Sequence, residues 1–151
     1  MRVLIQRVSQ ASVIVNEKEH ANITNGLLVF LGIVSDDNAE DIEWLIHKIV
    51  NMRIFNDDNG VMNRSLLEIA GNMLIVSQFT LHAKTKKGNR PSYYLAANPS
   101  IAVPLYNLFV KKCNELLPTP VETGIFGANM KVCLCNHGPV TIMLDSKNKD
   151  I

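Results

Sequence analysis

The chain has 151 residues, of which 47% are hydrophobic and 19% charged, and its formal net charge is +1. This composition is ordinary for a globular protein and excludes disordered and fibrous classes, and the length fits one domain over residues 1–151. The net charge is too small to indicate nucleic-acid binding by the chain as a whole, so any RNA contact must come from a local patch.

The N-terminal residues and the cysteines indicate in which cellular compartment the protein is expected. The first ten residues lack the apolar core of a signal peptide, and the longest apolar run, residues 27–34, is far shorter than the ~20 residues of a membrane span. Cys113, Cys133 and Cys135 are odd in number, which argues against a disulfide framework. We therefore expect a cytoplasmic protein with reduced thiols and no membrane contact.

The first half of the chain reads as strands followed by a helix. Alternating residues 3–8 and the β-branched segment 12–15 predict two strands, and 16–20 predicts a polar turn. The continuous apolar run 26–34 is typical of a buried central strand. A helix is expected from about 38 to 52, with Asp37 and Glu40 resembling a capping box and a buried stripe formed by Ile42, Leu45, Ile46 and Ile49.

The second half contains further strands and one more helix. Residues 56–60 predict a turn, and 73–79 predict an apolar strand that ends in polar residues. A helix is expected over about 100–117, with Pro104 marking its true first turn and with Leu105, Phe109, Cys113 and Leu116 on one face. Residues 130–135 and 140–144 predict two last strands. The sequence therefore predicts an α+β fold, in which two helices pack on a mostly antiparallel sheet or half-barrel.

Residues 77–81 (SQFTL) form the first candidate site, because they end an apolar strand and open into a loop. Alternation on a strand would place Gln78 and Thr80 on one face, and Ser77 and Phe79 on the other. If the strand continued to His82, that imidazole would share the face of Thr80, which could be a nucleophile only beside a base. The alternative interpretation is a strand end whose hydroxyls satisfy local backbone groups.

Two further segments carry candidate chemistry. Residues 136–141 (NHGPVT) place a Gly138-Pro139 pair between two strands, where the base rate favours an ordinary trans turn. The segment after His82 carries four cations around a glycine, a pattern that suits phosphates, although on the residues alone an ordinary solvated loop is the favoured interpretation. These cations are Lys84, Lys86, Lys87 and Arg90.

Cys133, Cys135 and His137 would share one strand face and offer ligand types that zinc prefers. Three residues at this spacing on a straight strand lie too far apart to converge on one ion, and a fourth ligand is missing. Two packed small hydrophobic cysteines are the simpler interpretation. We expect neither a metal nor a cofactor.

Taken together, these segments resemble the D-aminoacyl-tRNA deacylase family over essentially the whole chain. Residues 1–8 (MRVLIQRV) look like the family's first strand, and 77–81 match one signature. Residues 87–92 (KGNRPS) are similar to the segment that follows it, while 123–128 (TGIFGA), Met130 and 136–141 match the other signature. His137 departs from the acidic residue frequent in the family, and Cys133, Cys135, His82 and the 84–87 stretch are also unusual.

The resemblance implies a homodimer whose active site lies at the subunit interface. It implies a cis Gly138-Pro139 bond, inserted into the active site of the other subunit, where backbone carbonyls exclude an L-side chain and admit a D-side chain or glycine. The implied reaction is hydrolysis of the ester at the 3′ end of D-aminoacyl-tRNA, and of glycyl-tRNA mischarged on tRNA-Ala, releasing the free amino acid and tRNA.

The resemblance also suggests roles for single residues. Backbone N–H groups around Phe79 and Thr80 would stabilise the oxyanion, with Ser77 in the same motif, Gln78 orienting substrate or water, and Thr80 either holding the ester or attacking it. Arg7 would orient the Gly138-Pro139 element beside Asn136, and Phe79 and Met130 would line the pocket. Lys84, Lys86, Lys87 and Arg90 are the expected tRNA contacts.

Three other functions remain open on the residues alone. A non-catalytic RNA-binding module would show salt-dependent binding without turnover. A hydrolase of small D-amino-acid esters or amides would be indifferent to the tRNA body. A zinc protein would use Cys133, Cys135 and His137, and would carry about one zinc per chain.

Overall fold

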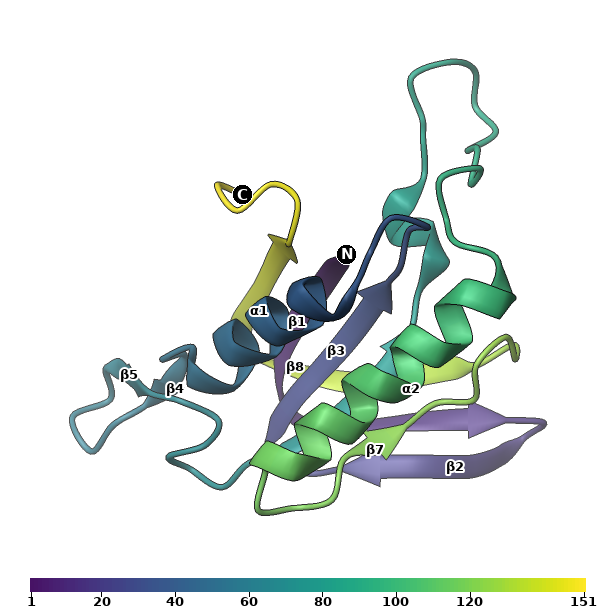
Figure 1. Cartoon of the computed structure of the whole chain (residues 1–151). Helices are drawn as coiled ribbons and strands as arrows, with labels where there is room; N and C mark the ends of the chain where they lie inside the picture. The colour runs from purple at the N-terminus through teal and green to yellow at the C-terminus, as the bar shows by residue number, and fades with distance from the viewer.

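The computed structural model describes residues 1–151, and a curved six-stranded sheet forms its centre (Figure 1). The strand path is β2-β1-β3-β6-β7, with β8 paired to β1. Strand β3 pairs with the first half of β1 and β2 with the second half, whereas β8 follows β1 along nearly its whole length. The strands of this sheet are β1 (Arg2–Val15), β2 (Lys18–Ile23), β3 (Gly26–Gly32), β6 (Asn72–Ser77), β7 (Glu122–Thr123) and β8 (Lys131–Asp145).

The sheet is mixed. All pairs made by β1 are antiparallel, while β3-β6 and β6-β7 are parallel. Parallel neighbours need a long crossover, which α1 (Ala39–Asn51) and the small hairpin β4 (Phe55–Asn56) and β5 (Met62–Arg64) provide between β3 and β6. Strand β2 also approaches β6 and β7, so the sheet is nearly closed. The predicted α+β class is confirmed.

Helix α1 and the longer α2 (Pro99–Leu116) lie against the same side of the sheet (Figure 1). The predicted stripe of α1 is buried in the main core. Its predicted cap was wrong: Asn38 is the N-cap and Asp41 completes the capping box. Asp37 is engaged elsewhere, because its carboxylate accepts from the Val34 N–H at 2.8 Å and pairs with the Met1 amino group.

Helix α2 differs from the prediction at its start and on its buried face. It begins at Pro99, and Pro104 lies inside it. The Ser100 carbonyl, which loses its partner because Pro104 has no N–H, is on an exposed residue where water can replace that hydrogen bond. The buried face contains Phe109 and Cys113 as expected, together with Ala102 and Tyr106. Leu105 is partly buried against the core, whereas Leu116 is exposed. No helix in the structure has the length and apolar character needed to cross a bilayer.

Three strand predictions also need correction. Residues 2–15 form one strand and not two. The turn into β2 is shorter than the predicted 16–20, because only Asn16 and Glu17, both with positive φ, lie between the strands. The strand predicted over 73–79 ends at Ser77 and gives way to the 3-10 turn η1 (Phe79–His82). The two last predicted strands are one strand, β8, interrupted by a bulge. The turn predicted over 56–60 is confirmed within the β4-β5 hairpin.

Candidate active site

A pocket of about 280 Å³ opens at the carboxyl end of β6. Its walls come from the ends of β3 and β6, from the start of η1, and from the segment that leads into β8. Eight of its eleven lining residues are hydrophobic, so the pocket suits an aromatic or aliphatic ligand group. The lining residues are Leu31, Ile33, Val76, Ser77, Gln78, Phe79, Phe126, Gly127, Ala128, Met130 and Val132.

The turn η1 forms the polar rim of this pocket. The Gln78 N–H donates to the Leu31 carbonyl at 2.8 Å, so the residue that precedes the turn is still hydrogen-bonded to β3. A Cβ atom at Gly32 would lie 2.9 Å from the Gln78 carbonyl oxygen, so only glycine lets the turn sit this close to β3. The first N–H groups of a helical turn, here those of Phe79 and Thr80, have no partner within the turn and can receive a developing negative charge.

Gln78 and Thr80 are in direct contact because the turn η1 brings them together. The predicted division of faces along a strand was wrong, because β6 ends at Ser77 and Ser77, Gln78 and Phe79 line the same pocket. The Gln78 side-chain amide donates to the Thr80 hydroxyl at 2.5 Å. No imidazole or carboxylate hydrogen-bonds the Thr80 hydroxyl. The condition under which His82 would share the face of Thr80 is not met, because β6 ends at Ser77 and His82 is buried within η1.

Phe79 stands at the pocket mouth with 55% of its surface exposed. Its ring meets the Tyr93 ring edge to face, with centroids 5.0 Å apart. Met130 and Phe126 line the same pocket. Met130 fits because residue 124 is glycine: a Cβ atom there would lie 2.6 Å from the Met130 sulfur.

Gly138 and Pro139 bulge out of β8 and are exposed. Gln6 pairs with Thr141 and Val8 with Asn136, so Arg7 alone faces the whole bulge. Asn136 closes its base, accepting from the Val140 N–H at 3.1 Å and donating to the Thr141 hydroxyl at 2.8 Å. The Gly138-Pro139 bond is cis. Neither residue lines the pocket of its own chain.

The cationic segment forms a narrow loop that projects from the body of the protein above η1 (Figure 1). Its base is closed by two backbone hydrogen bonds between Lys84 and Ser92, of 2.8 and 2.9 Å. Lys84, Lys86, Lys87 and Arg90 are all exposed, and none of them is paired with an acid. The loop therefore presents four unpaired cations at the same end of the molecule as η1.

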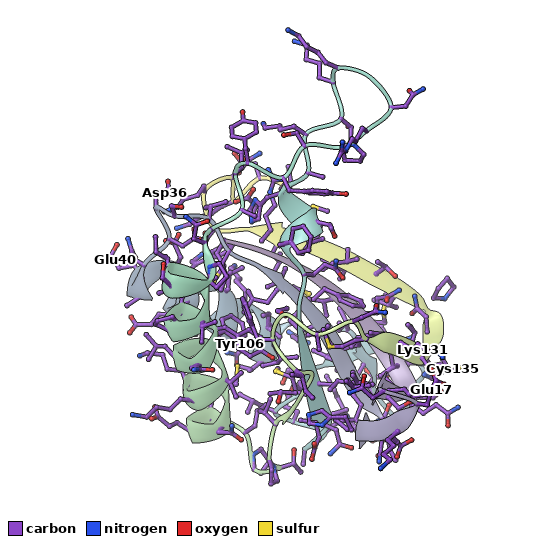
Figure 2. All side chains as sticks on the ribbon, turned by 90° about the vertical axis from the view of Figure 1, so that its right-hand side faces the viewer. Glu17, Asp36, Glu40, Tyr106, Lys131 and Cys135 are labelled. Atoms are coloured by element: carbon purple, nitrogen blue, oxygen red, sulfur yellow. The ribbon has the colours of Figure 1, made fainter.

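Cys133 and Cys135 are exposed on β8, so the interpretation of packed hydrophobic cysteines was wrong for this pair. Figure 2 shows Cys135 at the molecular surface. With His137 they do not converge, and no group of three His, Cys, Asp or Glu side chains could hold a metal ion.

Comparisons with known proteins agree with the motifs. The family model described as D-Tyr-tRNA(Tyr) deacylase matches residues 4–145. The chain belongs to this family. D-aminoacyl-tRNA deacylases of Flavobacterium psychrophilum and Bacteroides fragilis are 59% and 57% identical to it over 150 residues, covering 99% of this chain and all of each relative. The family resemblance inferred from the sequence is thus confirmed, and with it the class of enzyme, a deacylase.

Solved structures support the same fold. A c-Myc DNA unwinding element binding protein superposes with a TM-score of 0.91 at 37% identity, covering 96% of this chain and 98% of its own. A probable eukaryotic D-amino acid tRNA deacylase superposes with a TM-score of 0.80 at 22% identity, covering 95% and 97% of the two chains. The second likeness concerns the fold alone.

The pocket and its mouth also include two aromatic residues that were not among the predicted site residues. Tyr93 and Phe126 contribute aromatic surface at and inside the pocket, but neither was proposed as a site residue. Phe126 lies within the 123–128 signature, so the motif itself held the signal. Tyr93 follows the cationic segment directly, and two adjacent tyrosines after a basic loop were the available clue.

Proposed function

We propose that this protein hydrolyses the ester bond between a D-amino acid and the 3′ end of tRNA, without a cofactor and in the cytoplasm. Glycyl-tRNA mischarged on tRNA-Ala is a further proposed substrate, because glycine has no side chain to exclude. Membership of the deacylase family supports the reaction class, and the names of the relatives support the D-aminoacyl-tRNA substrate.

The observation that carries the proposal is the position of η1 at the rim of an apolar pocket. Ester hydrolysis develops negative charge on the carbonyl oxygen, and preorganised backbone N–H donors stabilise such a charge. The N–H groups of Phe79 and Thr80, at the start of the turn, would donate to the ester oxygen. The apolar walls would hold the terminal adenosine or the amino-acid side chain. Ser77 ends the strand that presents this turn.

The protein supplies no evident general base. Thr80 is hydrogen-bonded only to Gln78, so neither residue resembles an activated nucleophile. We propose that Gln78 and Thr80 orient the ester and the attacking water, and that the 2′-hydroxyl of the substrate ribose assists proton transfer.

The Gly138-Pro139 bulge is the proposed chiral filter, acting across a homodimer interface. It is exposed and absent from its own pocket, so it can approach an active site only in a second subunit. There its carbonyl groups would accept hydrogen bonds from the substrate ammonium and block an L-side chain. The exposed Leu134 and Met143 of β8 give the strand apolar area for such an interface.

The four cations of the projecting loop are the proposed tRNA contacts. The loop that carries them projects from the end of the molecule where η1 lies, so they could bind acceptor-stem phosphates while the 3′ end enters the pocket. Each phosphate contact adds salt dependence, and we expect affinity for tRNA to fall steeply with ionic strength.

The deciding experiment compares hydrolysis of D-Tyr-tRNA, L-Tyr-tRNA and Gly-tRNA(Ala) at equal, low enzyme concentration. We expect rapid loss of the D and glycyl substrates with the L substrate spared. Equal hydrolysis of D and L substrates would retain the esterase and refute the chiral filter. Binding of tRNA with no hydrolysis by the folded protein would favour a nucleic-acid-binding module instead.

A further inference from the structure

A second pocket, of about 400 Å³, lies on the other side of η1 from the candidate active site. We call it the Tyr94 pocket. Figure 2 shows Asp36, one of its lining residues, at the same end of the molecule as the projecting loop. It is lined by Met1, Arg2, Val34, Ser35, Asp36, His82, Tyr94, Leu95, Asp145 and Lys147.

The charged groups of this pocket nearly cancel and are held in place. The Arg2 guanidinium bridges Asp145, at 2.6 Å, and the Leu81 carbonyl of η1, at 3.1 Å. Lys147 contacts Asp41 at 2.9 Å and the Asp36 carbonyl at 3.1 Å. With paired cations and the free carboxylate of exposed Asp36, the pocket suits a neutral ligand with both donors and acceptors better than a phosphate.

Two side chains in the pocket lack the partners that their chemistry calls for. His82 is only 6% exposed, and its Nε2 has no hydrogen-bond partner. This atom is enclosed by the protein, so the contacts that a ligand can reach come from the other lining residues. Tyr94 has 75% of its surface exposed, which leaves an aromatic face free at the pocket edge.

We propose that the Tyr94 pocket binds the nucleobase of the cytidine that precedes the terminal adenosine of tRNA. Tyr94 stacks on the base, Asp36 accepts from the exocyclic amino group, and Arg2 or Lys147 donates to the ring acceptors. The inference rests on the proposed function, since it places a second nucleotide of that substrate.

The spacing of the two pockets fits consecutive nucleotides. Phe79 lines the first pocket and His82 the second, and three residues of a 3-10 helix rise about 6 Å. After β3 the chain shows the same arrangement, because Ile33 lines the first pocket and Val34 the second. One nucleotide unit can bridge this separation around η1.

The test compares two small substrates, the 3′-D-tyrosyl ester of adenosine and the same ester of the dinucleotide CpA. We expect the wild-type enzyme to have a higher kcat/KM for the CpA ester. Tyr94→Ala should remove this gain, which we expect to be about 5- to 150-fold from the usual effect of removing a stacking side chain, and should leave the adenosine ester unaffected. Tyr94→Phe should keep the gain, and Leu116→Ala, an exposed apolar residue at the far end of α2, should change neither substrate.

A second comparison tests recognition of the base. The ester of UpA lacks the exocyclic amino group, so the wild-type enzyme should prefer CpA over UpA, and Asp36→Asn should reduce that preference. Equal kcat/KM for adenosine, CpA and UpA esters in the wild type, or a gain that survives Tyr94→Ala, would overturn the inference while leaving the deacylase proposal intact. Failure to hydrolyse D-Tyr-tRNA itself would instead contradict the proposed function.

Discussion

The Arg7 guanidinium holds the base of the Gly138-Pro139 bulge by donating from Nε to the His137 carbonyl at 2.9 Å. Its Nη1 donates to the Ile54 carbonyl at 2.5 Å. Arg7 is buried, and these neutral carbonyls, not an acid, stabilise its charge. The bulge of β8 is therefore tied to the segment after α1 through one side chain, and its orientation depends on the fork of that guanidinium.

Arg7→Lys should separate the geometry of this fork from its charge. A lysine ammonium cannot reach both carbonyls in the same arrangement, and each lost hydrogen bond to a charged group costs roughly 1.5–3 kcal/mol. We expect a lower free energy of unfolding in urea and at least a roughly tenfold slower hydrolysis of D-Tyr-tRNA, as one lost bond implies. Arg64→Lys, in an exposed ion pair with Asp58, is the matched control and should be nearly silent. Full activity of Arg7→Lys would show that the bulge needs no such anchor.

Gly138→Ala should be far more damaging than the same change at Gly60. Gly138 has φ +127°, and a Cβ atom there would lie 2.7 Å from Nη2 of Arg7. Gly60 also has positive φ, at +78°, but nothing lies within 4 Å of its Cβ position. Backbone strain alone costs about 1–3 kcal/mol, so Gly60→Ala should lose only stability. Gly138→Ala should also displace Arg7 and slow D-Tyr-tRNA hydrolysis, and equal kinetics of the two variants would contradict this.

Local sequence patterns predicted the parts of this fold that depend on hydrophobic periodicity. The α1 stripe and the buried run of β3 follow from burial, and both are confirmed. Patterns could not predict that β6 stops at Ser77, because the turn that follows packs against β3 in the space that Gly32 leaves on that strand. Tertiary contacts of this kind are invisible to periodicity.

In the candidate site, too, residues that are adjacent in sequence could be predicted, whereas residues brought in by tertiary contacts could not. The 77–81 motif placed Ser77, Gln78, Phe79 and Thr80 together because they are adjacent in sequence, and Met130 came only through the family resemblance. Tyr93 reaches Phe79 through the closure of a loop, which no spacing rule predicts. His82 could share the face of Thr80 only on a continued strand, and a 3-10 turn follows Ser77 instead.

Thr80→Ala should keep substantial activity, within roughly tenfold of the wild type, because removing one neutral hydrogen bond costs about 0.5–1.5 kcal/mol. Its hydroxyl contacts only the Gln78 amide, whereas the proposed oxyanion donors are backbone groups that the substitution preserves. Single-turnover hydrolysis of D-Tyr-tRNA measures this directly. A fall to the uncatalysed rate in a protein that unfolds at the wild-type temperature would restore Thr80 as the nucleophile.

The pH dependence of stability should report on His82. Burial lowers the pKa of this imidazole below its ordinary value of 6.5, and the nearby Arg2 and the N-terminal amino group lower it further, against the Gly32 backbone and Asp37. The native protein therefore keeps His82 neutral where the unfolded chain already binds a proton. The contribution of neutral His82 to the free energy of unfolding is fully present above about pH 6.5 and is lost as the pH falls below that value.

We expect this loss to appear as a lower free energy of unfolding at pH 5.5 than at pH 7.5. Urea unfolding of the wild type and His82→Gln at both pH values isolates it, because the other titrating groups are common to both proteins. The wild-type stability should fall more than that of the variant. If His82→Gln does not fold, an NMR titration of the wild-type imidazole serves instead, and a His82 midpoint at or above 6.5 would contradict the prediction.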